Sequence, residues 1–91
     1  MKTLQPTTKF RKDLKRYKNN TEKLEALEEV LVLLQNEQPI PKEYYPHIIK
    51  GEYKGCMECH IQGDFLLIWI DDENDIIELV RLGSHSELFK E

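Results

Sequence analysis

The hydrophobic pattern divides the chain into an N-terminal half with helical periodicity and a C-terminal half of short alternating strands. Residues 1–5 alternate in polarity, which predicts a first strand that Pro6 ends. Apolar residues then recur every three or four positions, which predicts two helices. The first helix carries its apolar stripe at Phe10, Leu14 and Tyr17, and its other faces are rich in Lys and Arg. This helix therefore has a core side and a cationic side.

The second helix is predicted to begin at Asn20 or Thr21, because either side chain can cap its first turn. Its leucines repeat at spacings of three, four and three residues (Leu24, Leu27, Leu31 and Leu34). Residues 30–34 are continuously apolar, so we expect the second half of this helix to be heavily buried. The two helices would form an αα-hairpin with a very short connection.

Prolines at positions 39, 41 and 46 follow the helices, so no regular element is expected over residues 37–47. Three strands of an antiparallel sheet come next, near residues 56–61, 65–70 and 76–82, with turns at residues 62–64 and 71–75. Ser84 and Glu87 then match the S-x-x-E capping box of a short final helix. Helices grouped apart from a meander of strands predict a single α+β domain over residues 1–91.

Side chains on a strand alternate between the two faces of a sheet. In the first strand of the hairpin, this places ionisable groups on one face (Cys56, Glu58 and His60) and core-like groups on the other (Met57, Cys59 and Ile61). In the last strand Arg81 has the same parity as Ile77 and Leu79. We therefore expect one arginine on an otherwise apolar row.

Composition and charge narrow the class of protein. A hydrophobic content of 40% in 91 residues suits one small domain. No apolar run approaches the roughly 20 residues of a membrane span, and the N-terminal residues lack a signal-peptide core, so a cytoplasmic protein without a membrane segment is expected. The net charge is −4, yet residues 1–20 hold seven Lys and Arg against one Asp. This basic end either favours a polyanion or is a solvated helix face, and the sequence leaves both readings open.

Cys56, Cys59 and His60 form a literal C-x-x-C-H, the motif of c-type haem attachment. The signal for export that such proteins carry is missing. Residues i and i+3 of a strand also point to opposite faces, which argues against a shared metal or a redox pair. We expect Cys59 to pack in the core and Cys56 to be an incidental surface thiol.

Four residues suited to acid/base chemistry remain, with one arginine near them in sequence (His47, His60, Asp64, His85 and Arg81). Whether they converge depends on the strand order, which periodicity alone does not give. If they converge, groups that titrate near neutrality would lie beside a fixed cation, a set that suits acid/base chemistry on a phosphodiester. Taken singly, each histidine is more typical of a surface or packing residue.

These residues belong to a longer pattern: His47-x-x-x-Gly51, Tyr53-Lys54-Gly55, Cys59-His60, Gly63-Asp64-Phe65 and Arg81-Leu82-Gly83-Ser84-His85-Ser86-Glu87-Leu88-Phe89. Together with the leading strand, the two helices and the proline-containing connector, it resembles the YafQ branch of the RelE/ParE superfamily of bacterial toxins. The resemblance covers nearly the whole chain.

The resemblance implies a toxin of a type II toxin–antitoxin system. Such a toxin is an endoribonuclease, or mRNA interferase, that cuts mRNA in the ribosomal A site and is silenced by a cognate antitoxin protein. The implied fold is the microbial-RNase-like β-α-α-β-β-β-(α) domain, with two N-terminal helices packed on an antiparallel sheet. No metal or organic cofactor is expected, and operator DNA would be bound only through the antitoxin complex.

The family's catalytic positions fall here on His47, His60, Asp64 and His85, with Arg81 and Phe89 in support. Asp64 or His60 is the expected general base and His85 the general acid, although base and acid can exchange roles. His47 and Arg81 would bind the phosphate. Phe65 or Phe89 would stack on a nucleobase, although Phe89 equally suits packing of the last helix on the core.

Two departures from the family concern binding. Phe65 stands where the family often has tryptophan, and the chain is acidic whereas such toxins are commonly basic. The basic helix, through Lys12, Lys15 and Arg16, is therefore the expected docking face on the ribosome. The rival hypothesis is a non-catalytic protein of the same fold that binds a protein target.

Overall fold

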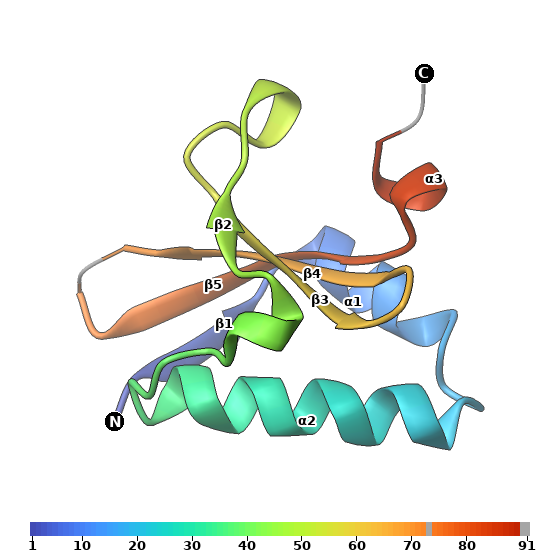
Figure 1. Ribbon diagram of the computed structural model, residues 1–91, viewed down its shortest axis with the longest axis horizontal. Helices are drawn as coiled ribbons and strands as arrows, with labels where there is room; N and C mark the ends of the chain where they lie inside the picture. Colours follow the sequence, from blue (N-terminus) through green and yellow to red (C-terminus); the bar gives the residue numbers. More distant parts are fainter. Residues whose placement is uncertain (73, 90–91) are drawn as a thin grey trace.

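The computed structural model describes residues 1–72 and 74–89, and it forms one five-stranded sheet with helices on both faces (Figure 1). In chain order the elements are β1 (Thr3–Pro6), α1 (Thr8–Lys15), α2 (Thr21–Gln35), a 3₁₀ turn η1 (Lys42–Tyr44), β2 (His47–Ile48), a 3₁₀ turn η2 (Gly51–Tyr53), β3 (Met57–Gln62), β4 (Phe65–Asp71), β5 (Ile76–Gly83) and α3 (His85–Leu88). The predicted α+β class and the predicted order of helices and main strands are confirmed.

The sheet differs from the prediction at both of its edges. Its strand order is β1-β5-β4-β3-β2, and β1 pairs with β5 in parallel, so the sheet is mixed rather than antiparallel. At the other edge His47 and Ile48 form β2, which pairs with β3 and begins at the last residue of the segment where prolines argued against a regular element. Pro46 directly precedes β2, so both residues of β2 keep their N–H groups for the ladder.

The central strand β4 is buried on both faces, and residues 65–69 are each at most 4% exposed. The larger core lies between the sheet and the helices α1 and α2. A smaller cluster covers the opposite face (Ile49, Cys56, Leu66, Ile68 and Leu88). Figure 1 shows α2 along one side of the sheet, with α3 and the turn at residues 51–53 on the other. The sheet is therefore the middle layer of the molecule.

The two helices begin where predicted, but α1 is shorter than expected and α2 is less completely buried. The Thr7 side chain caps α1 and the Asn20 side chain caps α2. Helix α1 ends at Lys15, earlier than its apolar stripe suggested. In the second half of α2 Val30 is fully buried, whereas Val32 is 47% exposed. A continuous run of apolar residues extends around the helix, and only the residues that face the sheet are buried.

A bulge in β5 corrects the predicted parity of the last strand. Ile68 pairs with Arg81 whereas Trp69 pairs with Leu79, so Val80 is an extra residue on β5. Leu82 consequently joins Leu79 in the larger core, and Arg81 lies opposite Ile68 of the smaller cluster. The expectation of an arginine on the core-facing row was wrong because a bulge interrupts strict alternation.

Asp13 on α1 binds the part of β5 that β1 does not reach. Its carboxylate is 2% exposed and accepts hydrogen bonds from Arg81 Nε at 2.7 Å, Arg81 Nη2 at 3.1 Å, the Leu82 backbone N–H at 3.0 Å and Arg16 Nη1 at 3.2 Å. The Thr7 hydroxyl donates to the Val80 carbonyl on the same edge. These contacts fix α1 against β5.

The two cysteines lie on opposite faces of the sheet. Cys59 is fully buried in the larger core, as predicted, and burial raises the pKa of its thiol to about 12. Cys56 is also buried, within the smaller cluster, and burial raises its pKa as well. The expectation of a surface thiol at Cys56 was therefore wrong, because η2 and α3 give this face of the sheet a core of its own.

The predicted acidic turn at residues 71–75 is described except at Glu73, which lies outside the described residues. The Asn74 backbone N–H donates to the Asp72 side chain across it. Within the part of the chain that the structure describes, no helix is long and apolar enough to span a membrane.

Replacing Asp13 by alanine should lower the free energy of unfolding by about 3–5 kcal/mol, because the Arg81 side chain, only 14% exposed, loses its buried carboxylate partner. Urea denaturation measures this change. Lys12→Ala, one position earlier on an exposed face of the same helix, should change stability by no more than about 0.5 kcal/mol. A loss below about 1 kcal/mol for Asp13→Ala would contradict the structural role given to this carboxylate.

Candidate active site

The register of the sheet brings the three histidines together on the face opposite α2. His47 on β2 lies directly across from Glu58 on β3. His60, two residues further along β3, pairs with Leu66, and Leu66 pairs with Gly83 at the end of β5. The chain then turns into α3, whose first residue is His85. The strand order that the sequence left open thus places residues from three segments at one site.

The centre of this site is Glu58, whose side chain is only 4% exposed. Its Oε1 lies 3.2 Å from His47 Nε2 and 3.8 Å from His60 Nε2. Its Oε2 is buried and has no hydrogen-bond partner among the described residues. Sequence reasoning did not select Glu58, although it placed Glu58 on the same face as His60. That shared face was the available signal.

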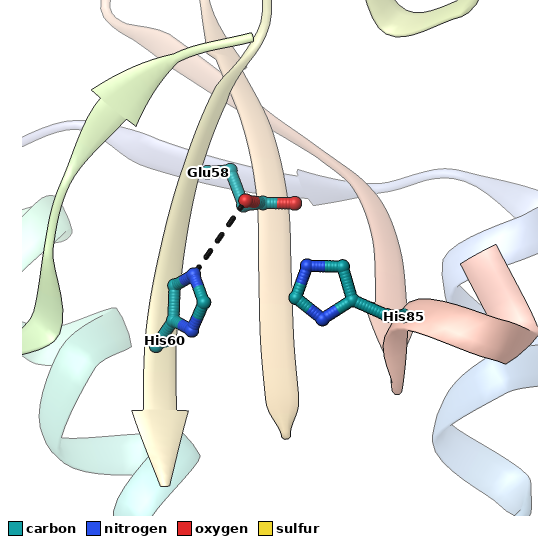
Figure 2. A group of neighbouring side chains, drawn as sticks. All are labelled: Glu58, His60 and His85. Carbon is teal, nitrogen blue, oxygen red and sulfur yellow. Dashed lines mark ion pairs between the residues drawn. The ribbon is translucent and has the colours of Figure 1, made fainter. Parts of the chain in front are cut away.

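Figure 2 shows the His60 and His85 rings side by side near the Glu58 carboxylate, with one ring nitrogen of each directed toward it. Glu58 and His60 come from β3, and His85 comes from the start of α3. One ligand atom from each of the three residues lies within 4.8 Å of the others. The site is therefore a compact group of two imidazoles and one buried carboxylate.

Asp64 holds His85 in place from the turn between β3 and β4. Its Oδ1 accepts the His85 backbone N–H at 3.0 Å and lies 2.9 Å from His85 Nδ1. These hydrogen bonds keep the pKa of Asp64 below its usual range, so the carboxylate is ionised and can only accept. His85 Nδ1 therefore carries a proton, and Nε2 stays available for proton transfer.

The backbone of the proline-containing connector orients His47. Its Nδ1 lies 2.8 Å from the Tyr45 carbonyl oxygen, which can only accept, so Nδ1 carries a proton. Its Nε2 then faces Glu58. The two ring nitrogens of His47 are thus held by a backbone carbonyl on one side and by the Glu58 carboxylate on the other.

Aromatic rings extend the histidine row at both ends. The His47 and His60 ring centroids are 6.2 Å apart, and those of His60 and His85 are 5.6 Å apart. Beyond His85 the Phe89 centroid lies at 5.9 Å, and beyond His47 the Tyr45 centroid lies at 4.6 Å. All four predicted acid/base residues and Phe89 therefore belong to one continuous site.

The sequence profile of the family described as "Bacterial toxin of type II toxin-antitoxin system, YafQ" matches residues 2–90. The chain belongs to the YafQ toxin family. A Haemophilus influenzae protein named as a YafQ toxin is 46% identical over 57 residues, which span 59% of this chain and 56% of that protein. The mRNA interferase toxin YafQ of Escherichia coli K12 is 29% identical over 82 residues, which span 88% and 87% of the two chains.

Solved structures of YafQ and of a toxin from Helicobacter pylori have the same fold. A metal-bound toxin from Helicobacter pylori superposes with a TM-score of 0.86 at 42% identity, covering 98% of this chain and 100% of that one. YafQ in the E. coli DinJ–YafQ complex superposes with a TM-score of 0.84 at 26% identity, covering 98% and 99%. These likenesses confirm the predicted RelE-like fold.

Phe65 does not line the site of this YafQ-family toxin. Its side chain is fully buried in the larger core, where its ring centroid lies 4.7 Å from that of Tyr17. A nucleobase cannot reach a ring that is fully buried. The expectation that Phe65 stacks on RNA was wrong, because this residue faces the core side of β4.

Arg81 is engaged with protein groups rather than directed at an open phosphate site. Two of its nitrogens donate to Asp13, which raises its pKa further above the usual value, and its Nη1 donates to the Tyr53 hydroxyl at 2.6 Å. The Tyr53 ring in turn lies 5.8 Å from that of Phe89. Arg81 therefore contacts the site only indirectly, by holding Tyr53 against Phe89.

The basic residues Lys12 and Lys15 on α1, and Arg16 directly after it, differ in how far their charge is compensated. Lys12 and Lys15 are exposed. Arg16 pairs with Asp13 at 3.2 Å and with Glu87 at 3.9 Å, so part of its charge is compensated within the molecule. A docking role on this helix consequently rests more on the two lysines than on Arg16.

Proposed function

We propose that this YafQ-family toxin cleaves mRNA in the ribosomal A site by acid/base catalysis. Membership in a family of type II toxins confirms the predicted toxin, and E. coli relatives are named mRNA interferases. The observation that carries the proposal is the gathering of three imidazoles around one buried carboxylate, with the Nδ1 protons of His47 and His85 fixed by acceptors.

The reaction begins when the ribose 2′-oxygen attacks the adjacent phosphorus. A bond forms between O2′ and phosphorus, and the bond between phosphorus and O5′ of the next nucleotide breaks. The general base takes the 2′-OH proton, and the general acid gives a proton to the departing O5′. The products are a 2′,3′-cyclic phosphate and a 5′-hydroxyl. Two imidazoles, one neutral and one protonated, are sufficient for both transfers.

His60 is the better candidate for the base and His85 for the acid. Asp64 Oδ1 already accepts two hydrogen bonds from His85, so Asp64 acts by positioning that imidazole rather than by taking the substrate proton. This arrangement leaves His85 Nε2 for proton transfer, as a carboxylate does for the histidine of a hydrolase triad. Which imidazole starts protonated decides the direction, so the two can exchange roles.

The remaining site residues would stabilise charge and hold the RNA. His47, between the Tyr45 carbonyl and the Glu58 carboxylate, is placed to share its proton with a phosphate oxygen. Phe89 offers an aromatic surface beside His85 for an unpaired base. Lys12 and Lys15 would contact ribosomal RNA, and such contacts weaken steeply with salt.

A cognate antitoxin is the expected regulator, since an E. coli relative has been solved as the DinJ–YafQ complex. By analogy, we propose that an antitoxin segment covers this site or the basic helix in the cytoplasm, and that operator DNA is bound only through that complex.

Expression in cells without the antitoxin should arrest growth and create new mRNA 5′ ends within reading frames. His85→Ala should lower the rate of cleavage by about 10²–10⁴-fold, because it removes one proton-transfer group. Asp64→Asn should also lower the rate, because the amide weakens the hold on His85 Nδ1. Ser86→Ala, an exposed neighbour on α3, is the matched control and should cleave at the wild-type rate.

The rival non-catalytic hypothesis predicts a different outcome of the same experiment. Growth arrest without new 5′ ends, which His85→Ala leaves unchanged, would favour binding to a protein target over RNA cleavage. Near wild-type cleavage by both His85→Ala and Asp64→Asn would overturn the residue assignment while leaving the nuclease itself in place.

Transition-metal binding at the same residues is a second candidate function. Glu58 presents a buried oxygen without a hydrogen-bond partner, and His60 and His85 present imidazole nitrogens close to it. Carboxylate and imidazole donors suit Zn²⁺ or Cu²⁺, and an H. pylori relative of this fold was solved with metal bound. We propose that a bound metal opposes cleavage, because it would occupy the nitrogen lone pairs that transfer protons.

Zn²⁺ should therefore inhibit RNA cleavage, and a chelator selective for Zn²⁺ over Mg²⁺ should restore it, because the ribosome itself needs Mg²⁺. Glu58→Gln should weaken zinc binding by at least about 10-fold in a calorimetric titration, because it replaces a charged ligand by a neutral one. Cys56→Ala should bind zinc like the wild type, because Cys56 lies in the smaller cluster away from the ligand group. Loss of cleavage on addition of the Zn²⁺-selective chelator, with Mg²⁺ kept in the buffer, or zinc binding unaffected by Glu58→Gln, would contradict this proposal.

A further inference from the structure

Tyr45 lies at the His47 end of the histidine row and has no role in either core. Its ring centroid is 4.6 Å from that of His47 and 5.8 Å from that of His60. Tyr45 is nevertheless 64% exposed, whereas the neighbouring Tyr44 packs against the larger core. A large aromatic side chain is thus presented to solvent directly beside the imidazoles of the site.

The backbone holds Tyr45 in a conformation that its sequence disfavours. Its φ of 50° and ψ of 55° are left-handed, which is uncommon for a residue other than glycine, and the following Pro46 disfavours helical conformations further. Two hydrogen bonds maintain it: the Tyr45 N–H donates to Lys42 O at 2.9 Å, and His47 Nδ1 donates to Tyr45 O at 2.8 Å. The second bond ties the position of Tyr45 to the orientation of a site histidine.

We infer that Tyr45 is a nucleobase-stacking residue of the ribonuclease site, an inference that rests on the proposed function. Tyr45 and Phe89 flank the three imidazoles at opposite ends of the row. Cleavage needs an RNA strand whose phosphate lies at His60 and His85. A base on the His47 side of that phosphate then meets the exposed Tyr45 ring. Unpaired bases stack readily on such rings, and stacking strength rather than base-edge hydrogen bonding sets a mild preference.

Tyr45 therefore acts on substrate affinity and on the choice of nucleotide at one position of the codon. The larger π-surface of a purine gives it more stacking area than a pyrimidine has. We expect a purine to be favoured at the nucleotide that meets Tyr45, and this preference to disappear with the ring.

The first test compares cleavage kinetics of Tyr45 variants on ribosomes programmed with a defined A-site codon. Tyr45→Ala should lower kcat/KM by about 5- to 100-fold, mainly through KM, because base–aromatic stacking is lost. Tyr45→Phe should stay within about two-fold of the wild type, since the flat ring remains, whereas Tyr45→Leu should behave like alanine. Ile48→Ala is the matched control, because Ile48 is 68% exposed on the same sheet edge.

The second test separates stacking from mere support of His47. Three mRNAs each carry an abasic nucleotide at a different position of the A-site codon. At one abasic position, kcat/KM of the wild type should fall by the same factor as the Tyr45→Ala substitution causes on intact mRNA. At that position, kcat/KM of Tyr45→Ala should not fall any further. Equal losses for wild type and Tyr45→Ala at every abasic position would overturn the inference, as would full activity of Tyr45→Ala. Absence of cleavage by the wild type would instead overturn the proposed function, and the inference with it.

Discussion

The buried carboxylate of Asp13 is the contact on which the position of the site depends. It joins α1 to β5 through Arg81 and the Leu82 backbone, at the point where β1 no longer covers the sheet edge. Arg81 faces Asp13 because the bulge at Val80 removes it from the core-facing row. The chain that leaves this anchored segment is Gly83 and Ser84, followed by His85. The salt bridge between Asp13 and Arg81 therefore helps to fix the position of His85, which follows Arg81 at the start of α3.

Two residues at the candidate site depart from the usual rules for buried polar groups and backbone conformation. Glu58 keeps a buried oxygen without a hydrogen-bond partner among the described residues, which costs about 1–3 kcal/mol. Tyr45 keeps a left-handed backbone before a proline, at a similar cost. Burial of apolar side chains in the two cores on either side of β4 offsets these costs. Such local conflicts are expected where function, rather than folding, has selected the residues.

Local patterns predicted the parts of the structure that local forces determine. The hairpin of β3 and β4, the helix caps and the capping box at Ser84 follow from periodicity and short-range hydrogen bonds. The parallel pairing of β1 with β5, the strand β2 and the bulge in β5 depend on contacts between distant segments, so the pattern could not give them. The parity of Phe65 with Leu67 and Trp69 was a usable signal for its burial, and it was outweighed by its place beside Asp64.

The site shows the same division between local and distant information. The histidines were identified by their residue type and by the resemblance to a family, and the fold then placed them together. For Glu58 the sequence offered only its face shared with His60, because its burial between two imidazoles depends on the fold. Arg81 looked like a phosphate ligand only as long as its partner Asp13, far away in the sequence, was unknown.

We propose that imidazoles, and not a metal-bound water, carry out the cleavage. The RNA ends distinguish these two mechanisms. Cleavage products are made in a buffer that keeps Mg²⁺ for the ribosome and contains a chelator selective for transition metals, and their termini are analysed by mass spectrometry. Attack by the 2′-hydroxyl predicts a 2′,3′-cyclic phosphate on one fragment and a 5′-hydroxyl on the other, formed at an undiminished rate. A 5′-phosphate, or cleavage that this chelator abolishes, would rule out attack by the 2′-hydroxyl under imidazole catalysis.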